Sequence, residues 1–142
     1  MEISAVRQQI LLAIDRAKRA AADRRAANDE AGREYGVFLE QVAVPVFRQT
    51  SSVLRAEGYL FNLFTPGGGV RLMSDKSADD FIELVLDTTG VVPQVMGRTS
   101  RAWGNRTNVS ERPLNPSGPI REIVEADVLE FLLKALEPFV DK

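Results

Sequence analysis

The chain has 142 residues, a formal net charge of −2 from 18 basic and 20 acidic side chains, 44% hydrophobic residues, and neither cysteine nor histidine. This length suits one domain, and the hydrophobic fraction is too high for a disordered chain. The two missing residue types exclude disulfides, Cys–His and Ser–His catalysis, and the usual zinc and haem ligation. No catalytic motif is present, so we expect no catalytic residues, no metal and no cofactor.

Charge is distributed unevenly along the chain. Residues 88–121 hold five arginines and one glutamate, a net charge of +4, and residues 122–142 hold six acidic and two basic groups, a net charge of −4. We interpret this opposition as an internal electrostatic match, because a nucleic-acid-binding domain is usually more strongly basic. The chain shows neither a signal-peptide pattern at its start nor a long apolar run, so we expect a cytoplasmic protein without membrane contact.

The first 34 residues contain nine alanines and no proline or aromatic residue, a composition that predicts a helix. Apolar residues recur at every third or fourth position, which is the heptad seam of a coiled coil, interrupted by Arg24. The seam residues that we predict to form an oligomer interface are Ile3, Val6, Ile10, Ala13, Ala17, Ala20, Ala27 and Ala31. Large side chains occupy only the first turns, with Leu11 and Ile14 beside them. Because alanine buries little area, this helix needs a partner helix, either in its own domain or in another chain.

A second apolar segment, residues 37–54, ends before Gly58 and contains Pro45. Proline lacks the amide hydrogen of a helix interior, so we expect a kink or a break there. Residues 28–36 also carry helix-capping signals, so residues 2–57 are predicted to form either one long bent helix or a helical hairpin. One continuous helix would be about 84 Å long, too long for a small domain to cover, and that length would favour a dimer.

From Tyr59 onward the apolar pattern changes from helical spacing to alternation. We predict strands over residues 59–65, 70–74, 81–87 and 91–99, with a glycine-rich turn at 66–69. Pro93 places the fourth strand at a sheet edge or marks its start. Residues 100–121 contain three asparagines and three prolines, so we predict a loop with a short strand around 107–112.

The chain ends in a segment with one broad apolar face, which predicts a helix. The residues of this face are Val128, Phe131, Leu132, Ala135, Leu136 and Phe139. Glu130 and Lys134 are spaced to pair on its outer side, and Pro138 is expected to end the helix. We therefore predict an α+β fold: a helical interaction segment over residues 1–57, then an antiparallel meander of four or five strands with the last helix packed on it over residues 58–142. The two parts are expected to form one integrated domain.

Five side chains form the strongest candidate ligand site: Arg98, Arg101, Trp103, Arg106 and Arg112. Guanidinium groups bind carboxylates and phosphates by paired hydrogen bonds, and an indole stacks on a base or on an arginine. The stretch 98–112 is therefore a hypothetical binding loop for an anionic ligand or a nucleic acid strand. The acidic last helix is an alternative internal partner for these arginines.

Two further features are weaker. Asp75, Asp79 and Asp80 could bind a divalent cation in a carboxylate-based enzyme, but their spacing does not match a calcium loop and is typical of a turn. The three glycines at 67–69 are followed by a strand pattern rather than the helix of a phosphate-binding loop. Our leading hypothesis is thus a non-enzymatic protein–protein interaction or self-assembly module, with a homodimer or another protein as partner.

Overall fold

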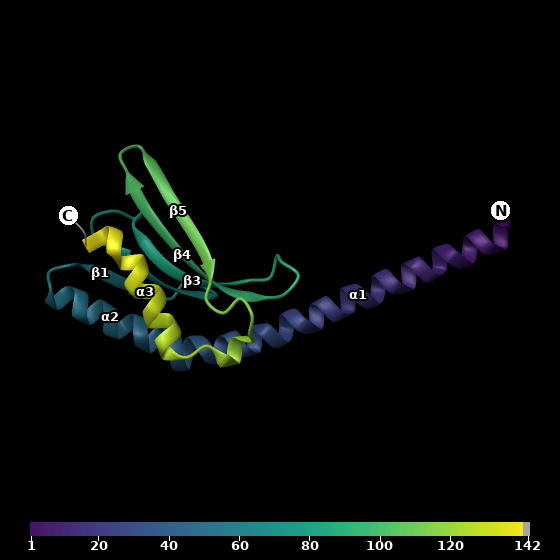
Figure 1. Cartoon of the computed structure of the whole chain (residues 1–142), viewed down its shortest axis with the longest axis horizontal. Coiled ribbons are helices and arrows are strands. Elements are labelled where there is room, and N and C mark those ends of the chain that lie inside the picture. The colour runs from purple at the N-terminus through teal and green to yellow at the C-terminus, as the bar shows by residue number, and fades with distance from the viewer. Residues whose placement is uncertain (141–142) are drawn as a thin grey trace.

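The computed structural model describes residues 1–140 and has an α+β fold (Figure 1). Its elements are α1 (Ile3–Phe38), a π-helical turn η1 (Leu39–Ala43), α2 (Val44–Ala56), β1 (Phe61–Phe64), β2 (Gly69–Ser74), β3 (Phe81–Asp87), β4 (Gln94–Trp103), β5 (Arg106–Pro113), a 3₁₀ turn η2 (Ile120–Glu122) and α3 (Glu125–Val140). The five strands form one antiparallel sheet in sequence order. The predicted fold class, the meander and the final helix are therefore confirmed.

The N-terminal segment is one continuous helical rod, so the helical-hairpin alternative is wrong. Gly32 and Gly36 lie inside α1, and neither adopts the positive φ that ends a helix. Around them, Ala31, Tyr35 and Phe38 are buried against the rest of the molecule. This packing stabilises the helix across residues that would otherwise favour a cap.

The irregularity predicted at Pro45 takes the form of a π-helical turn rather than a break. In a regular helix the ring of Pro45 would clash with the carbonyl of Gln41. The wider turn η1 precedes Pro45 directly, and Pro45 then stands in the first turn of α2. Amide groups in a first turn have no partner within their own helix, so proline is tolerated there.

The β4–β5 hairpin differs most from the sequence prediction. β4 begins at Gln94, directly after Pro93, and runs to Trp103, so its last four residues lie in the stretch that was predicted to be loop. The short strand predicted around 107–112 is confirmed as the middle of β5. β4 lies between β3 and β5 and is not an edge strand. Backbone pairing on both sides extends β4 through residues of modest strand preference.

Helices α2 and α3 lie over one face of the sheet (Figure 1). Phe47 of α2, Leu72 and Leu84 of the sheet, and Leu132 of α3 are fully buried between these layers. The predicted apolar face of the last helix is confirmed, with Phe139 half-buried at its end. That helix continues past Pro138 to Val140, contrary to the prediction, because its last turn is held by an edge-to-face contact between Phe139 and Phe61 at 5.5 Å.

The predicted turns between the first strands are confirmed. Gly68 has a φ of 81°, and the amide of Gly69 donates to the carbonyl of Pro66 at 2.9 Å, closing the β1–β2 connection. Across the portion that the structure describes, none of the helices combines the length and the apolar character needed to span a bilayer.

Candidate functional site

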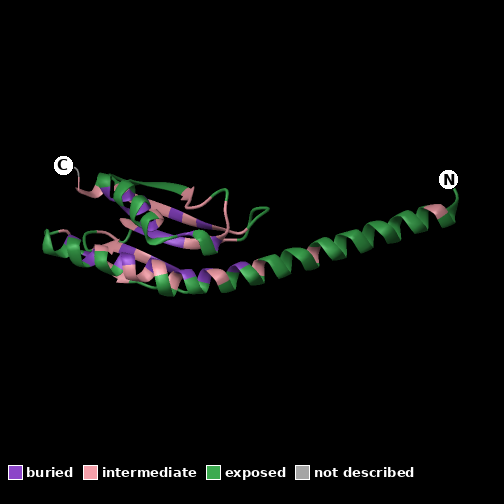
Figure 2. Cartoon of the chain, turned by 60° about the horizontal axis from the view of Figure 1, so that its bottom comes forward, coloured by how far each residue is buried: buried purple, intermediate pink, exposed green. Residues whose placement is uncertain are grey.

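The N-terminal part of α1 projects away from the rest of the molecule (Figures 1 and 2). We name residues 3–30 the arm and residues 31–140 the body. No residue of the arm is buried, and the first buried residue of α1 is Ala31, at 7% exposure. At 1.5 Å per residue the arm is about 42 Å long. The structure thus contains a long helical segment that the body does not cover.

Large apolar side chains of the arm lie in solvent. Ile3 is 86% exposed and Ile10 is 54% exposed, and Leu11, Leu12 and Ile14 are similarly open. Exposed apolar surface of this extent usually marks an interaction site. The ion pair between Arg19 and Asp15, at 3.1 Å, is itself exposed and adds only a few tenths of a kcal/mol, about the size of a surface pair. Contacts within the chain therefore do little to hold the arm helical.

The structure leaves most of the predicted seam open. The open seam residues are Ile3, Val6, Ile10, Ala13, Ala17, Ala20 and Ala27. Ala31, the last predicted interface residue, is buried where η2 packs on α1. An ion pair of 3.2 Å between Arg121 of η2 and Glu34 of α1 lies beside it. The seam available to a partner therefore ends at Ala27.

The buried residues of α1 continue the heptad spacing of the open seam. Ala31 and Phe38, both buried, follow Ile10 and Arg24 at whole heptad steps along the chain. Tyr35 is turned only about 40° from Ala31 around an ideal helix. A straight helix turns by about 20° at each heptad step, so Ile3 lies about 80° around the helix from Ala31.

A second exposed apolar surface lies where the arm leaves the body. The β3–β4 loop contains Val91, which is 99% exposed, and Val92, which is also open to solvent. Both views show this loop projecting from the sheet along the direction of the arm, on the side of α1 that carries the body (Figures 1 and 2).

A third exposed apolar surface is the groove between α2 and α3. It has a volume of about 530 Å³ and is lined mainly by apolar side chains. Val53, Leu129 and Leu133 on its walls are exposed. This groove is the alternative place at which the body could contact another protein.

The five predicted ligand-binding residues do not form one cluster. Neighbouring residues of a strand point to opposite faces of the sheet. Arg98 pairs with Glu111, with Arg98 Nε 2.9 Å from Glu111 Oε1, and Arg98 Nη1 lies 3.7 Å from Glu83 Oε1. Arg112 belongs to the other face, where its guanidinium lies 5.5 Å from the ring centre of Phe131 in α3. Arg98 and Arg112 therefore cannot bind one small ligand together.

The other three predicted residues gather at the far end of the β4–β5 hairpin. The guanidinium of Arg101 lies 5.1 Å from the ring centre of Trp103. Trp103 stands opposite Arg106 in the strand register and is 61% exposed. These side chains form an exposed tip, because Gly104, at a φ of 60°, turns the chain beside them.

Two of the five arginines of residues 88–121 form ion pairs, Arg98 with Glu83 and Glu111 of the sheet and Arg121 with Glu34 of α1. Within residues 1–140 none of the five pairs with an acidic side chain of the last helix, so the expected match with that helix is not found there. Arg71, Glu83, Arg98 and Glu111 stand opposite one another on β2, β3, β4 and β5, a row of alternating charge. Nε and Nη2 of Arg71 both donate to Oε2 of Glu83, at 2.9 and 2.7 Å. In α3, Glu130 pairs with Lys134 at 3.5 Å, as predicted. Glu83 is only 4% exposed, and Arg71 and Arg98 of this row supply the positive charges that its buried carboxylate needs.

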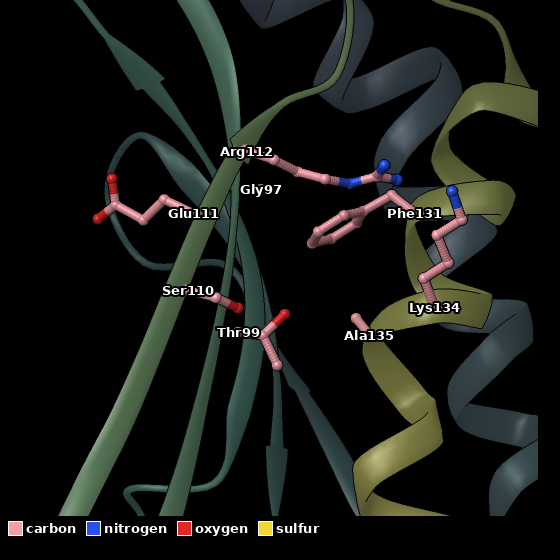
Figure 3. Close-up of a pocket in the computed structure, with 8 residues that line it drawn as sticks. All are labelled: Gly97, Thr99, Ser110, Glu111, Arg112, Phe131, Lys134 and Ala135. Carbon is pink, nitrogen blue, oxygen red and sulfur yellow. The ribbon is translucent and has the colours of Figure 1, made fainter.

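Arg112 lines a small hollow between the β4–β5 hairpin and α3 (Figure 3). Its volume is about 190 Å³, and the hydroxyls of Thr99 and Ser110 and the ammonium of Lys134 also line it. Figure 3 shows Glu111 pointing to the other side of the sheet. Two cations and two hydroxyls can bind a small anion there. Thr99, Ser110 and Lys134 escaped the sequence prediction, because spacing along the chain does not show that β4, β5 and α3 bring them together.

The acidic cluster Asp75, Asp79 and Asp80 lies in the turn between β2 and β3. Asp75 accepts a hydrogen bond from the side-chain amide of Asn62 at 2.9 Å, and Asp80 accepts one from the backbone amide of Ala102 at 2.7 Å. Within residues 1–140 no group of three acidic side chains is arranged to hold a metal ion. No protein-family model, curated protein or solved structure matches this sequence.

Proposed function

We propose that this protein is a non-enzymatic interaction module that assembles by pairing its arm with another helix. The observation that carries the proposal is the exposure of the arm, in which no residue is buried although Ile3, Ile10 and Ile14 are large and apolar. An isolated helix is only marginally stable in water, and its apolar side chains gain nothing while they remain exposed. A partner helix on the seam would remove both disadvantages.

The contribution of the arm to assembly can be tested by replacing one residue. Full burial of an isoleucine contributes about 1.5–3 kcal/mol, and an aspartate in its place would put an unpaired charge in the interface. Ile10→Asp should therefore abolish assembly. Gln8 lies about 160° around the helix from Ile10, on the side away from the seam. Gln8→Asp is the matched control, because it adds the same charge where no partner is expected.

The experiment is size-exclusion chromatography with light scattering over a range of concentrations. We expect the parent chain and Gln8→Asp to have a mass above the 15.7 kDa of one chain, and Ile10→Asp to have the mass of one chain. Circular dichroism of each variant reports whether the body remains folded. A parent chain that stays at 15.7 kDa at every concentration would contradict assembly with its own copy.

The groove between α2 and α3 provides a second control. Leu133 is exposed on the wall of this groove and belongs to the body. Leu133→Asp should leave the measured mass unchanged if the arm is the interface. If Leu133→Asp dissociates the assembly and Ile10→Asp does not, the interface is the groove and the proposal is wrong.

A second candidate function is the binding of a small anion in the hollow of Figure 3. It is favoured by the convergence of Arg112, Lys134, Thr99 and Ser110 on one small space. Titration calorimetry with inorganic phosphate would test it. Arg112→Gln should abolish the binding heat, and Arg106→Gln, at the exposed hairpin end, should not. Equal binding by both variants would exclude this hollow as the site.

A further inference from the structure

A cleft on the body brings aromatic rings and charged side chains of both signs together. It lies where the segment before β1, the β2–β3 turn and the end of β4 meet the last turn of α3. Among the described residues, none that lines it also lines the hollow of Figure 3 or the groove between α2 and α3. Its volume is about 450 Å³, within the range of pockets that hold small molecules. The cleft is therefore a separate place at which the body could bind a ligand.

The apolar part of the lining comes mostly from aromatic rings. Tyr59 and Phe61 line the cleft from the start of β1, and Phe139 lines it from α3. The rings of Phe61 and Phe139 are in edge-to-face contact at 5.5 Å. Phe61 is buried, and the other two rings are half-buried, so the fold holds this surface in place. An apolar group of a ligand would gain free energy by leaving water and packing on these rings.

The polar part of the lining carries charges of both signs. Lys76 and Arg101 are positive, and Asp75 and Asp80 are negative. Within residues 1–140 neither Lys76 nor Arg101 forms an ion pair with a carboxylate. Opposite charges that share a cleft without pairing can each bind the opposite charge of a ligand. The cleft can thus bind an anionic and a cationic group at the same time.

Two of these charged groups are oriented by the fold. The guanidinium of Arg101 lies 5.1 Å from the ring centre of Trp103, and a cation–π contact does not use up its N–H donors. Oδ1 of Asp80 accepts a hydrogen bond of 2.7 Å from the backbone amide of Ala102, so Oδ2 remains as an acceptor for a ligand. Because Ala102 follows Arg101 in β4, this hydrogen bond holds the carboxylate near the base of the arginine side chain. Such prior orientation reduces the entropy lost when a ligand binds.

We infer that the cleft binds a small zwitterion with an apolar side chain, of which a free hydrophobic amino acid is the simplest example. Its carboxylate would accept hydrogen bonds from Arg101, and its ammonium would donate to Asp80. Its side chain would pack on the rings of Tyr59 and Phe139. The site is independent of assembly through the arm, because no residue of the arm lines the cleft.

NMR titration of the full chain with L-phenylalanine and with L-leucine tests the class of ligand. The backbone amides of Lys76 and Ala102 should shift, because both residues line the cleft. Two analogues of L-phenylalanine each lack one charge: 3-phenylpropionate has no ammonium, and 2-phenylethylamine has no carboxylate. Each should bind about tenfold more weakly or worse, the effect of losing one charge-assisted hydrogen bond. An analogue that binds as tightly as L-phenylalanine would show that one of the two charges is not recognised.

Arg101→Gln and Asp80→Asn test the two proposed contacts. Asparagine at position 80 keeps a side-chain oxygen for the amide of Ala102, so this variant removes the charge without removing the hydrogen bond. Both variants should bind L-phenylalanine about tenfold more weakly or worse. The matched controls are Arg106→Gln and Asp79→Asn, since neither residue lines the cleft, and both should bind like the parent chain. Equal binding by all four variants, or no shift with either amino acid in the parent chain, would overturn the inference.

Discussion

The ring of Phe131 in α3 lies directly on the backbone of Gly97 in β4 (Figure 3). A Cβ atom added at Gly97 would be 2.6 Å from Cζ and 2.8 Å from Cδ1 of Phe131, both far inside van der Waals contact. The close approach of α3 to the sheet therefore depends on a glycine at this position. Phe131 is itself 3% exposed.

Gly97→Ala should destabilise the body by about 1–3 kcal/mol, the usual cost of overpacking a core. Gly32→Ala is the matched control, because a Cβ at Gly32 meets no atom within 4 Å and Gly32 lies inside α1. There alanine should raise stability by up to about 1 kcal/mol. Urea unfolding followed by circular dichroism measures both effects. Equal midpoints for Gly97→Ala and the parent chain would show that α3 does not rest on Gly97.

Arg98→Glu should destabilise the sheet, while Arg101→Glu should have little effect. Arg98 stands between Glu83 and Glu111, so a glutamate there would face two carboxylates across neighbouring strands. We expect a loss of about 1–3 kcal/mol, less than for a fully buried pair, because Arg98 is partly exposed. Arg101 pairs with no carboxylate of residues 1–140 and lies over Trp103 at the hairpin end. Thermal unfolding of the two variants would contradict this account if their melting temperatures fell equally.

Stability should fall as the pH rises above about 10, and Tyr35→Phe should reduce that fall. Burial, with a smaller contribution from the negative charge of Glu83, raises the pKa of Tyr35 well above its ordinary value. The unfolded chain would therefore lose the hydroxyl proton at a pH where the folded protein keeps it, and this difference favours unfolding. The folded hydroxyl donates to the carbonyl of Gly68 at 2.9 Å and approaches that of Leu84 at 3.3 Å.

At neutral pH, Tyr35→Phe should cost about 1–2 kcal/mol, because it removes these contacts and leaves a buried carbonyl without its partner. Urea midpoints of both proteins at pH 7 and at several values above 10 provide the test. The difference between the two proteins should shrink as the pH rises. A difference that grows with pH would mean that the folded hydroxyl is the more acidic one.

Local patterns in the sequence predicted the elements that depend on local chemistry. The spacing from Val128 to Phe139 predicted α3, and the glycines at 67–69 predicted the β1–β2 turn. Residues 28–36 could not show whether the helix continues, because they carry capping signals. The helix continues because Tyr35 and Phe38 are buried against the body, and that burial exists only in the folded protein. Likewise β5 is mostly exposed and polar, so its strand form comes from pairing with β4 rather than from its own residues.

The candidate site, too, could be predicted only where it depends on local spacing. The seam from Ile3 to Ala27 was visible in the spacing, since a heptad repeat requires only the chain itself. Spacing cannot reveal that Ala31 is buried or that η2 packs on α1, because η2 and Ala31 lie about 90 residues apart in the chain. The five predicted ligand residues were assumed to share one loop. They lie instead on a hairpin, whose alternation sends Arg98 and Arg112 to opposite faces.

Hydrogen exchange of the arm tests the central claim most directly, because it reports on the backbone of residues 3–30 in the unmodified chain. If the arm is held helical by a partner helix, its amides should be strongly protected at high protein concentration and lose that protection on dilution. The amides of buried β3 serve as an internal reference, since their protection should not depend on concentration in the same way. Arm amides that exchange equally fast at all concentrations, or that stay equally protected in Ile10→Asp, would contradict the account.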